Sequence, residues 1–447
     1  MARDKFEVDM TNGPLLGKII LYSLPLMASG ILQLLFNAAD MIVAGRWAGS
    51  VALAAIGATS SLINLLLNIF IGLSIGANVT VAHFYGAGRL DEVSETVHTA
   101  VIIAFTGGVL MAFVGALLAS PLLTLMGTPE DVLPHSVAYM RIYFIGMPVT
   151  LLYNFGSAIL RAVGDTKRPL MYLSCAGIIN VILNIIFVTR FNMGVSGVAL
   201  ATIISQAISA ALILRCMARS EGAYHLDFSK LKFSKDKAIR IARIGIPAGI
   251  QGAVFSISNV LIQSSVNSFG SIAIAGNTAQ ANLEGFVYNS MNSFYQTTLS
   301  FAGQNFGAEY YKRVYRVVNI CFVLVFVVGL VMGGVALLFG HSLLGIYSSD
   351  PEVVAFGYRR MKIFFTTYYL CGMQEVLVAG LRAAGYSIMP TVISLLGACG
   401  FRILWIYTIF RRFHTPEILY YSYPISWIII MVVFAICFRN HVYKKFA

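Results

Sequence analysis

Three acidic residues lie well inside long apolar runs of this sequence. Asp40 directly follows the run LYSLPLMASGILQLLFNAA, and Glu284 and Glu375 lie in later runs of the same kind. An ionised carboxylate at the centre of a lone membrane-spanning helix costs roughly 2.5 to 3.5 kcal/mol on insertion scales. An acid kept at that cost predicts a use, such as binding a cation or carrying a proton. Pairing with a buried arginine, or hydration near the surface, is the structural alternative.

Amide side chains recur at helical spacing in several of these runs. Asn180 and Asn184 are four residues apart, so on a helix they share one face. The eighth run is the most polar and places Tyr288 and Gln296 beside Glu284. Such faces either line a cavity or join helices through hydrogen bonds. Because they recur in both halves of the chain, we expect the set to line a cavity, although any single amide can serve packing alone.

The elements that must hold these side chains are membrane-spanning helices. Hydrophobic residues make up 58% of the 447 residues and charged residues 11%, against about 25% charged in soluble domains. Apolar runs of about 20 residues predict twelve spans. They begin near Leu15, Val51, Val93, Val132, Pro169, Val195, Ile239, Ile272, Val314, Val353, Ile388 and Ile418. We therefore expect an all-α integral membrane protein.

Basic residues predict the orientation of the spans. They gather in alternate connections and at both ends of the chain, among them Arg3, Lys444 and Lys445. The connections on the other side, such as TPEDVLPHS and SSDPEVV, are acidic, and we place Arg359 and Arg360 near that outer surface. The positive-inside rule then puts both termini in the cytoplasm. The same rule explains the net charge of +12, so no nucleic-acid binding is expected.

The second half of the chain repeats the first. At an offset of about 221 residues Pro25 meets Pro247, and HFYGAG meets QNFGAE. Each half has six predicted spans, an even number, so the halves are parallel repeats related by an axis along the membrane normal. We expect lobes at residues 1–219 and 238–447, joined by a polar linker at 220–237. Two such bundles can enclose a cavity and rock around it, which is the plan of many secondary transporters.

Other kinds of chemistry find no support in the sequence. The six cysteines and seven histidines are scattered, without the spacing of a zinc site or a disulfide framework. The segment GPLLGKI has the wrong glycine spacing for a phosphate loop. No nucleophile, base and orienting group are grouped, so we expect neither an enzyme nor a bound cofactor.

Taken together, the motifs resemble the multidrug and toxic compound extrusion (MATE) family. They are the early span with Pro25 and Asp40, the paired elements HFYGAG and AGQNFGA, and the paired elements RAVGDTKRP and LRAAG. The resemblance implies a V-shaped pair of six-helix bundles in the plasma membrane. It also implies export of small organic, usually cationic compounds in exchange for sodium ions or protons. We expect the chain to act as a monomer.

The resemblance further implies a cation-coupling site at Asp40, Asn180, Asn184 and Thr202. Asn184 stands where prokaryotic members carry a second acid, so one carboxylate is left. One carboxylate with two amide oxygens and a hydroxyl suits a sodium ion, because a hard cation prefers oxygen ligands. The same set suits a proton, because a carboxyl group in an apolar wall can load and unload it. Losing a carboxylate weakens sodium binding more than protonation, so protons are favoured and sodium stays open.

The acids of the second half correspond to family positions on the eighth and tenth helices, where drug and ion sites differ among branches. We expect a lipophilic cation to bind among Glu284, Glu375, Tyr288, Asn259 and Gln296. Pro25 has no amide hydrogen to donate and is expected to act as a hinge. A static kink is the alternative for this proline.

Two other functions stay open. A flippase for a lipid-linked saccharide can share this architecture, but an anionic headgroup would favour an arginine-lined cavity, whereas the mid-span charges are acidic. A channel is the third possibility. The different acids of the two halves argue for distinct sites and against a continuous pore.

Overall fold

Every regular element in the described part of the chain is a helix. The structure is a computed structural model, and it describes residues 5–443. The basic residues Arg3, Lys444 and Lys445, which contribute to the predicted orientation, lie outside this range. The all-α fold class predicted from composition is confirmed.

The chain divides into two compact units. Unit 1 consists of the described residues up to Asp9 together with Ile31–Gly249, and unit 2 of Met10–Gly30 together with the chain from Ile250 onward. Both divisions fall inside long helices, α1 (Leu15–Val43) and α8 (Lys235–Asn267), so each unit takes part of both. The lobe boundaries at residues 219 and 238 stay a prediction.

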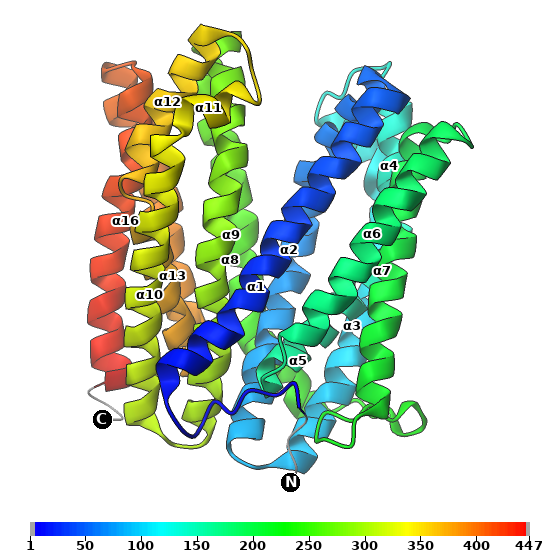
Figure 1. Ribbon diagram of the computed structural model, residues 1–447, viewed down its shortest axis with the longest axis vertical. Helices are drawn as coiled ribbons and strands as arrows, with labels where there is room; N and C mark the ends of the chain where they lie inside the picture. Colours follow the sequence, from blue (N-terminus) through cyan, green and yellow to red (C-terminus); the bar gives the residue numbers. More distant parts are fainter. Residues whose placement is uncertain (1–4, 444–447) are drawn as a thin grey trace. The chain divides into compact units, whose positions relative to one another are not determined.

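Unit 1 is a helical bundle in which glycine and proline set several helix ends (Figure 1). Besides parts of α1 and α8 it holds α2 (Ser50–Gly86), α3 (Leu90–Leu125), α4 (Leu133–Ile145), α5 (Met147–Val163), α6 (Lys167–Thr189) and α7 (Gly194–Arg219), with short turns η1 (Ala44–Ala48) and η2 (Phe228–Lys230). Gly49 and Gly164, which follow η1 and α5, have φ of 93° and 112°, a region that residues with a Cβ rarely adopt. The axes of α4 and α5 differ by 50°. Pro148 accounts for the bend, because it has no amide hydrogen to donate into α4.

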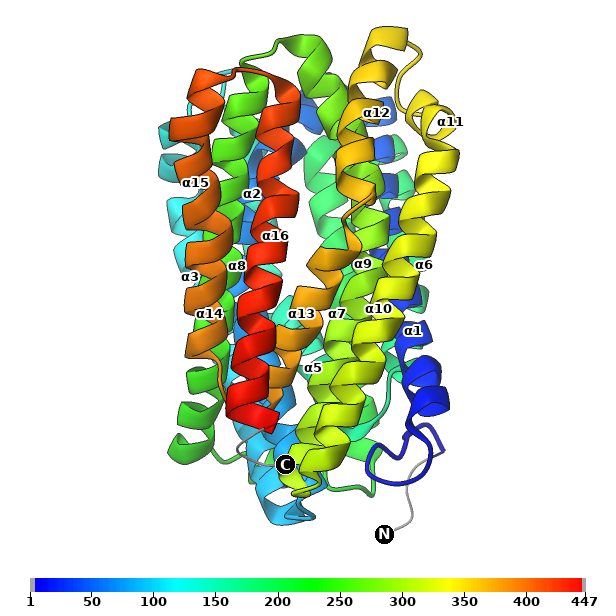
Figure 2. The same ribbon diagram turned by 90° about the vertical axis from the view of Figure 1, so that its left-hand side faces the viewer.

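Unit 2 has a corresponding succession of helices with more interruptions (Figure 2). Besides parts of α1 and α8 it holds α9 (Ser271–Gly307), α10 (Tyr311–Leu338), α11 (Gly340–Gly345), α12 (Pro351–Phe365), α13 (Tyr369–Ala383), α14 (Ile388–Ser394), η3 (Leu395–Gly400), α15 (Phe401–Trp405), η4 (Ile406–Phe410), α16 (Pro416–Phe438) and η5 (Arg439–Tyr443). The four elements from α14 to η4 form one continuous rod, in which η3 and η4 are π-helical. In Figure 2 this rod lies beside α16, which also packs against α13. Turns of π-helix are rare and frequently lie at functional sites.

The helices account for the twelve predicted spans. Nine helices in the described range are long and apolar enough to cross a membrane, and the bent pair of α4 and α5 makes a tenth. The helix α9 is long enough at 37 residues, but a row of amide side chains makes it too polar to be recognised by hydropathy. The pair of α12 and α13 carries arginine, lysine and glutamate side chains. Both remaining spans are therefore present as helices, and the twelve-helix fold is confirmed.

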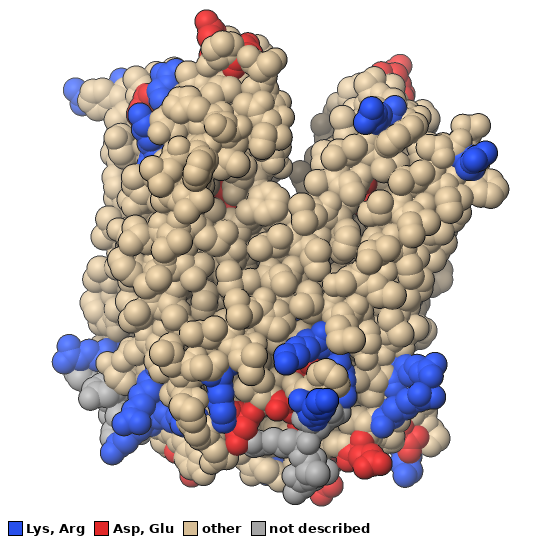
Figure 3. Space-filling view, viewed as in Figure 1, with Lys and Arg blue, Asp and Glu red and all other residues tan. Residues whose placement is uncertain are grey.

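The sides of the units are apolar. On the face shown in Figure 3, Lys, Arg, Asp and Glu gather at the ends of the helices and are sparse between them. Large apolar side chains are exposed, among them Leu117 at 74% and Leu396 at 69%. Apolar surface of this extent is costly in water and favourable against lipid acyl chains.

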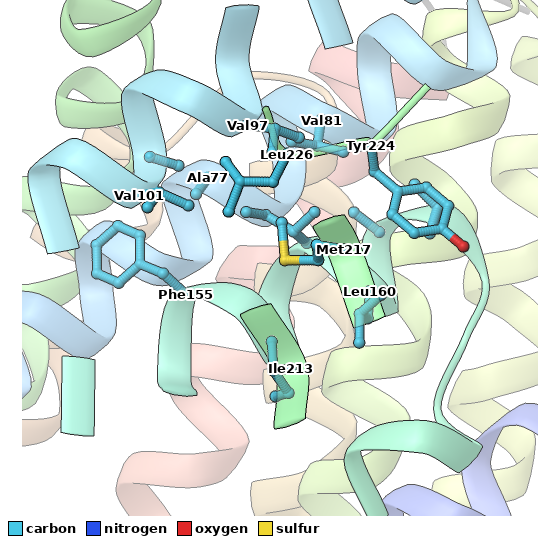
Figure 4. Close-up of a cluster of buried hydrophobic side chains, with 14 of the residues drawn as sticks. Ala77, Val81, Val97, Val101, Phe155, Leu160, Ile213, Met217, Tyr224 and Leu226 are labelled. Carbon is cyan, nitrogen blue, oxygen red and sulfur yellow. The ribbon is translucent and has the colours of Figure 1, made fainter. Parts of the chain in front are cut away.

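The core of unit 1 includes part of the predicted linker. Side chains of α2, α3, α5 and α7 meet in the cluster drawn in Figure 4. Tyr224 and Leu226, from the segment expected to be a polar linker, are each 1% exposed within this cluster. The backbone nitrogen of Asp227 also donates a hydrogen bond to Nε2 of His98 on α3, at 3.2 Å. Buried side chains therefore dock this segment onto unit 1.

Glycines bring α2 and α8 into backbone contact inside unit 1. A Cβ on Gly72 would overlap the backbone of Gly245 and Gly249, and one on Gly76 would overlap the carbonyl oxygen of Ile241. Small residues permit such an approach of two helices in a membrane. Gly72 and Gly76 belong to the polar face of the second predicted span, and at these two positions that face serves helix packing.

Candidate functional site

Asp40, Asn180, Asn184 and Thr202 lie together in unit 1. Asp40 comes from α1, the two asparagines from α6 and Thr202 from α7. Asn184 Nδ2 donates hydrogen bonds to Oδ1 of Asp40 and, at 3.3 Å, to Oδ1 of Asn180. Thr202 Oγ1 donates to Oδ2 of Asp40 and accepts from Nδ2 of Asn180, both at 3.4 Å. The four side chains form one hydrogen-bond network, whose role in coupling stays a prediction.

A glycine allows α1 to approach α6 closely at this network. A Cβ on Gly177 would overlap the ring of Phe36. Phe36 and Asp40 lie one turn apart on α1, and Gly177, Asn180 and Asn184 follow one another along one face of α6. The apolar contact and the polar contact therefore belong to the same pair of helix faces.

The network offers oxygen atoms to a monovalent cation. Asn184 is fully buried, and its Oδ1 has no hydrogen-bond partner among the described residues. A buried oxygen without a partner is uncommon, and either a bound cation or a proton on Asp40 could satisfy it. Within residues 5–443 no three Asp, Glu, His or Cys side chains gather as a metal cluster. A single carboxylate among neutral oxygens suits a sodium ion or a proton better than a divalent cation.

Two tyrosines beside Asp40 were missed by the sequence reasoning. Tyr139 and Tyr143 on α4 stack with their ring centroids 6.1 Å apart, and both interact electrostatically with Asp40. Their spacing of four residues indicates a shared helix face. It does not show which neighbouring helix that face meets, so no pattern in the sequence connects these tyrosines with Asp40.

In unit 2, Glu284 is paired with an arginine that was wrongly predicted to lie near the outer surface. Arg360 on α12 is 7% exposed, and its Nη2 donates to Oε2 of Glu284 on α9 at 2.9 Å. Its Nη1 donates to the carbonyl oxygen of Asn277 at 3.2 Å and to Oε1 of Gln280. The structural alternative considered for this acid, pairing with a buried arginine, is the arrangement present.

The helical period separates Arg360 from its neighbour Arg359. Arg359 keeps 57% of its side chain exposed and lies 3.6 Å from Glu417 at the surface. Arg360 falls in line with Phe356 and Phe364, four residues to either side, and all three are buried. This spacing is visible in the sequence, since residues i and i+4 share a helix face. The prediction treated the basic residues of this segment as one group and so did not distinguish Arg360 from Arg359.

A cavity of about 330 Å³ lies beside the ion pair. It is lined by three of the five predicted substrate residues: Asn259, Glu284 and Tyr288. The rest of its wall consists of the guanidinium of Arg360 together with amide, aliphatic and aromatic side chains, among them Tyr368, Tyr420 and Tyr423. A cavity of this size and mixed lining is typical of a small-molecule site.

Glu375 and Gln296 do not line this cavity. Glu375 on α13 is partly exposed and interacts electrostatically with Tyr288 and with Arg382. In the part of the chain that the structure describes, no basic side chain forms an ion pair with Glu375. Gln296 lies two turns beyond Tyr288 on α9 and is partly buried. The predicted substrate residues therefore separate into a cavity group of three, Asn259, Glu284 and Tyr288, and two residues outside the cavity wall, Glu375 and Gln296.

A second buried arginine of unit 2 was also missed. Arg402 on α15 is 4% exposed and donates from Nε to Oγ of Ser426 at 3.2 Å. Its guanidinium carbon lies 4.0 Å from the centroid of the Tyr423 ring. The π-helical turns η3 and η4 flank α15 on both sides. An arginine inside an apolar run is itself a sequence signal, so this residue could have been identified.

Pro25 lies inside α1, which continues as a helix on both sides of it. Its carbonyl oxygen accepts a hydrogen bond from Oγ of Ser29 at 2.9 Å. Pro25 belongs to unit 2 and Asp40 to unit 1, so the division of α1 falls between them. The hinge and the static kink both stay predictions.

Comparison with known proteins identifies one family. The family model MatE matches the chain twice, at residues 25–186 and 247–408, which confirms the internal repeat. The chain is 31% identical over 392 residues to the probable multidrug resistance protein YoeA of Bacillus subtilis, covering 86% of this chain and 84% of that protein. It is 30% identical over 389 residues to YpnP of the same organism, covering 87% of each. The structure of a MOP superfamily transporter from Pyrococcus furiosus matches with a TM-score of 0.92 at 18% identity, over 99% of both chains.

A membrane protein of twelve helices in two repeats, with buried charges in each, has the plan of a secondary transporter. The chain belongs to the MatE family of multidrug and toxic compound extrusion transporters. It is accordingly a transporter of small molecules in a lipid bilayer and not an enzyme.

Proposed function

We propose that this chain exports small organic compounds across the plasma membrane in exchange for protons taken up at Asp40. The observation that carries the proposal is the Asp40 network. Asp40 is a partly exposed carboxylate held by an amide and a hydroxyl, and no basic side chain of the described residues is paired with it. Such a carboxylate is free to exchange a cation. Two relatives are named as probable multidrug resistance proteins, which supports an organic substrate.

In this mechanism Asp40 takes a proton when the site opens outward and releases it when the site opens to the cytoplasm. Rotation of the Asn184 amide lets its unpartnered Oδ1 accept a hydrogen bond from the protonated carboxyl. Protonation thereby rearranges hydrogen bonds between α1, α6 and α7. Each pH unit of gradient supplies about 1.4 kcal/mol per proton, and each charge moved through 100 mV about 2.3 kcal/mol. Pro25, whose missing amide hydrogen weakens α1, is the proposed bending point.

Sodium is the alternative coupling ion. It would use the oxygen atoms of Asp40, Asn180, Asn184 and Thr202, because a hard cation binds carboxylate, amide and hydroxyl oxygens. The single carboxylate favours the proton, since sodium binding gains more from a second negative charge than protonation does.

Lipophilic cations are the proposed substrates at Glu375. Its carboxylate has no ion-pair partner among the described residues and interacts electrostatically with Tyr288, and aromatic faces attract organic cations. We place both termini in the cytoplasm on the distribution of basic residues, and we expect the transporter to act as a monomer.

Transport by the purified protein in proteoliposomes tests the coupling. A pH gradient and a sodium gradient are imposed separately, and efflux of the fluorescent cation ethidium is recorded. We expect Asp40→Asn to abolish efflux driven by the pH gradient. Asp131→Asn, which changes an exposed acid of the same unit, is the matched control and should transport like the wild type. Full gradient-driven efflux by Asp40→Asn would show the proposal to be wrong, and wild-type efflux driven by sodium alone would assign the site to sodium.

A flippase for a lipid-linked saccharide is the alternative function. Arg360 in the wall of the cavity is the observation in its favour, because an anionic headgroup seeks arginine. The ion pair with Glu284 offsets that charge, so the cavity is a weak anion site. Translocation of a fluorescent lipid-linked saccharide by the same proteoliposomes, without any gradient, would support the flippase.

A further inference from the structure

We infer that Arg360 sets the ligand class of the cavity in unit 2, which takes uncharged aromatic molecules with hydrogen-bond donors and disfavours permanent cations. The inference rests on the proposed function in one respect, namely that the chain exports small organic compounds; we infer that this cavity is a second site for them. It concerns the cavity beside Glu284 and leaves Glu375, outside the cavity wall, as the site proposed for lipophilic cations.

The ion pair removes the attraction that Glu284 would exert on a cation. Arg360 is held by three acceptors, which are Glu284, the carbonyl oxygen of Asn277 and the side-chain oxygen of Gln280. A guanidinium fixed in this way keeps its planar geometry and its charge. The carboxylate keeps 19% of its side chain exposed against 8% for the arginine. It therefore still presents an acceptor to the cavity, while the pair together carries no net charge.

A second positive charge, that of Arg402, lies against another residue of the wall. Tyr423 lines the cavity, and Arg402 stacks on its ring with the guanidinium carbon 4.0 Å from the centroid. Among the described residues no acid forms an ion pair with Arg402. Arg402 adds one positive charge next to the wall, and Glu375, which interacts electrostatically with the wall residue Tyr288, offsets it, so the charges of Glu284, Arg360, Arg402 and Glu375 sum to zero. A permanent cation entering the cavity therefore gives up its hydration without meeting a net negative charge, in a medium where charges are poorly screened.

The remaining wall favours a flat polar molecule. Tyr288, Tyr368, Tyr420 and Tyr423 supply aromatic faces, and the amides of Asn259, Gln263 and Asn277 supply hydrogen-bonding groups. Aromatic rings pack on one another in stacked or edge-to-face arrangements. The carboxylate oxygens of Glu284 accept hydrogen bonds from a hydroxyl or amine of the ligand. These features together define an uncharged aromatic ligand that donates hydrogen bonds.

A matched pair of probes isolates the effect of charge. 4-tert-Butylphenol and 4-hydroxyphenyltrimethylammonium have nearly the same shape and the same hydroxyl donor, and they differ in one positive charge. Binding of each to the purified protein in detergent is measured by isothermal titration calorimetry. The quantity compared is the ratio of the two dissociation constants in each variant relative to the wild type, so that partition of the phenol into micelles cancels.

We expect Arg360→Met to shift this ratio toward the cation by at least about tenfold, because it leaves Glu284 unpaired. Arg360→Lys, which keeps the charge, and Arg359→Met, which changes the exposed neighbour, should leave the ratio unchanged. The double variant Arg360→Met with Glu284→Gln removes both charges and should bring the ratio back toward the wild-type value. Glu284→Gln alone leaves Arg360 unpaired and should shift the ratio away from the cation by at least about tenfold.

An unchanged ratio in Arg360→Met and in Glu284→Gln overturns the inference. If Arg360→Met does not fold, Glu284→Gln alone decides, since its expected shift has the opposite sign. A wild-type protein that binds the ammonium probe and does not bind the phenol also overturns it. Binding in detergent needs no gradient, so these outcomes are independent of the coupling assay. Failure of coupling at Asp40 would leave the binding ratios as they are, and failure of the ratios would leave the coupling result standing.

Discussion

Asn184 donates a hydrogen bond to Asp40, so this acid of unit 1 is held by a neutral group. The corresponding relationship in unit 2 is different, because Glu284 is held by the guanidinium of Arg360 at 2.9 Å. A carboxylate with neutral partners keeps its negative charge available to attract a cation. In a carboxylate paired with arginine, the guanidinium already neutralises that charge. The two units therefore offer different chemistry at these acids, although one family model matches the chain twice.

Replacing Asn184 by aspartate tests the role of the missing second carboxylate. Asn184→Asp places two negative charges in the network, which should raise sodium affinity by at least about tenfold because a hard cation gains from each added anionic oxygen. Equilibrium binding of ²²Na⁺ to the purified protein measures this. Asn184→Ala is the control, since it removes the hydrogen bond to Asp40 without adding charge. Sodium binding in Asn184→Asp no tighter than in the wild type would contradict the ligand-charge argument.

Loss of the Thr202 hydroxyl is expected to have a smaller effect on transport than loss of the Asp40 carboxylate. It lies 3.4 Å from Oδ2 of Asp40 and 3.0 Å from the carbonyl oxygen of Val198, so its single hydrogen is shared between two acceptors. A neutral hydrogen bond contributes about 0.5 to 1.5 kcal/mol, and Thr202→Val should lower the initial rate of efflux driven by a pH gradient by up to about tenfold. Thr202→Ser keeps the hydroxyl and should transport like the wild type. Equal rates in the valine and serine variants would exclude the hydroxyl from the coupling network.

Most of the fold could be predicted because its determinants are local or repeated. Apolar runs of spanning length and the correspondence of Pro25 with Pro247 are visible without knowledge of packing. The interruptions were harder to predict, because a π-helical turn such as η3 depends on how α16 packs beside it. The division of α1 and α8 between two units is likewise a property of contacts between helices, and spacing along one helix does not contain it.

The candidate sites show the same limit at the level of single residues. Asn180 and Asn184 were predicted to act together because they share a helix face, and the structure places them so. Tyr139 and Arg360 were not connected with their acids, since a sequence shows the period of each helix but not its rotation against its neighbours. The burial of Arg360 could have been predicted from helical spacing, because Phe356 and Phe364, four residues away on either side, belong to the apolar face of the helix.

Glycine contacts between α2 and α8 predict a sharp difference between two positions of one helix. A Cβ on Gly72 would overlap the backbone of α8, whereas a Cβ on Gly57 would meet nothing within 4 Å. Gly72→Ala should therefore destabilise the protein by about 1 to 3 kcal/mol through overpacking. Gly57→Ala should be neutral or stabilising by up to about 1 kcal/mol, because alanine is the better helix former. Thermal unfolding in detergent followed by tryptophan fluorescence compares the two, and equal midpoints would mean that the helices can separate at no cost.

Arg382 predicts a structural role for the arginine of the motif LRAAG. It is 3% exposed, and it donates from Nη1 to the hydroxyl of Tyr295 at 2.7 Å and from Nη2 to Oε1 of Gln251 at 2.8 Å. These bonds join α13 to α9 and to the part of α8 that belongs to unit 2. Hydrogen bonds to a charged group are worth about 1.5 to 3 kcal/mol each, and Arg382→Leu leaves both buried acceptors unpaired.

We expect Arg382→Leu to lower the midpoint of thermal unfolding in detergent, and Arg382→Lys to recover part of the loss. An ammonium group lacks the planar fork that reaches two acceptors at once, so the recovery should be incomplete. Arg359→Leu, an exposed position on the same unit, is the control and should unfold like the wild type. A midpoint unchanged in Arg382→Leu would show that the two hydrogen bonds contribute nothing net, and the arginine of this motif would then need a functional explanation.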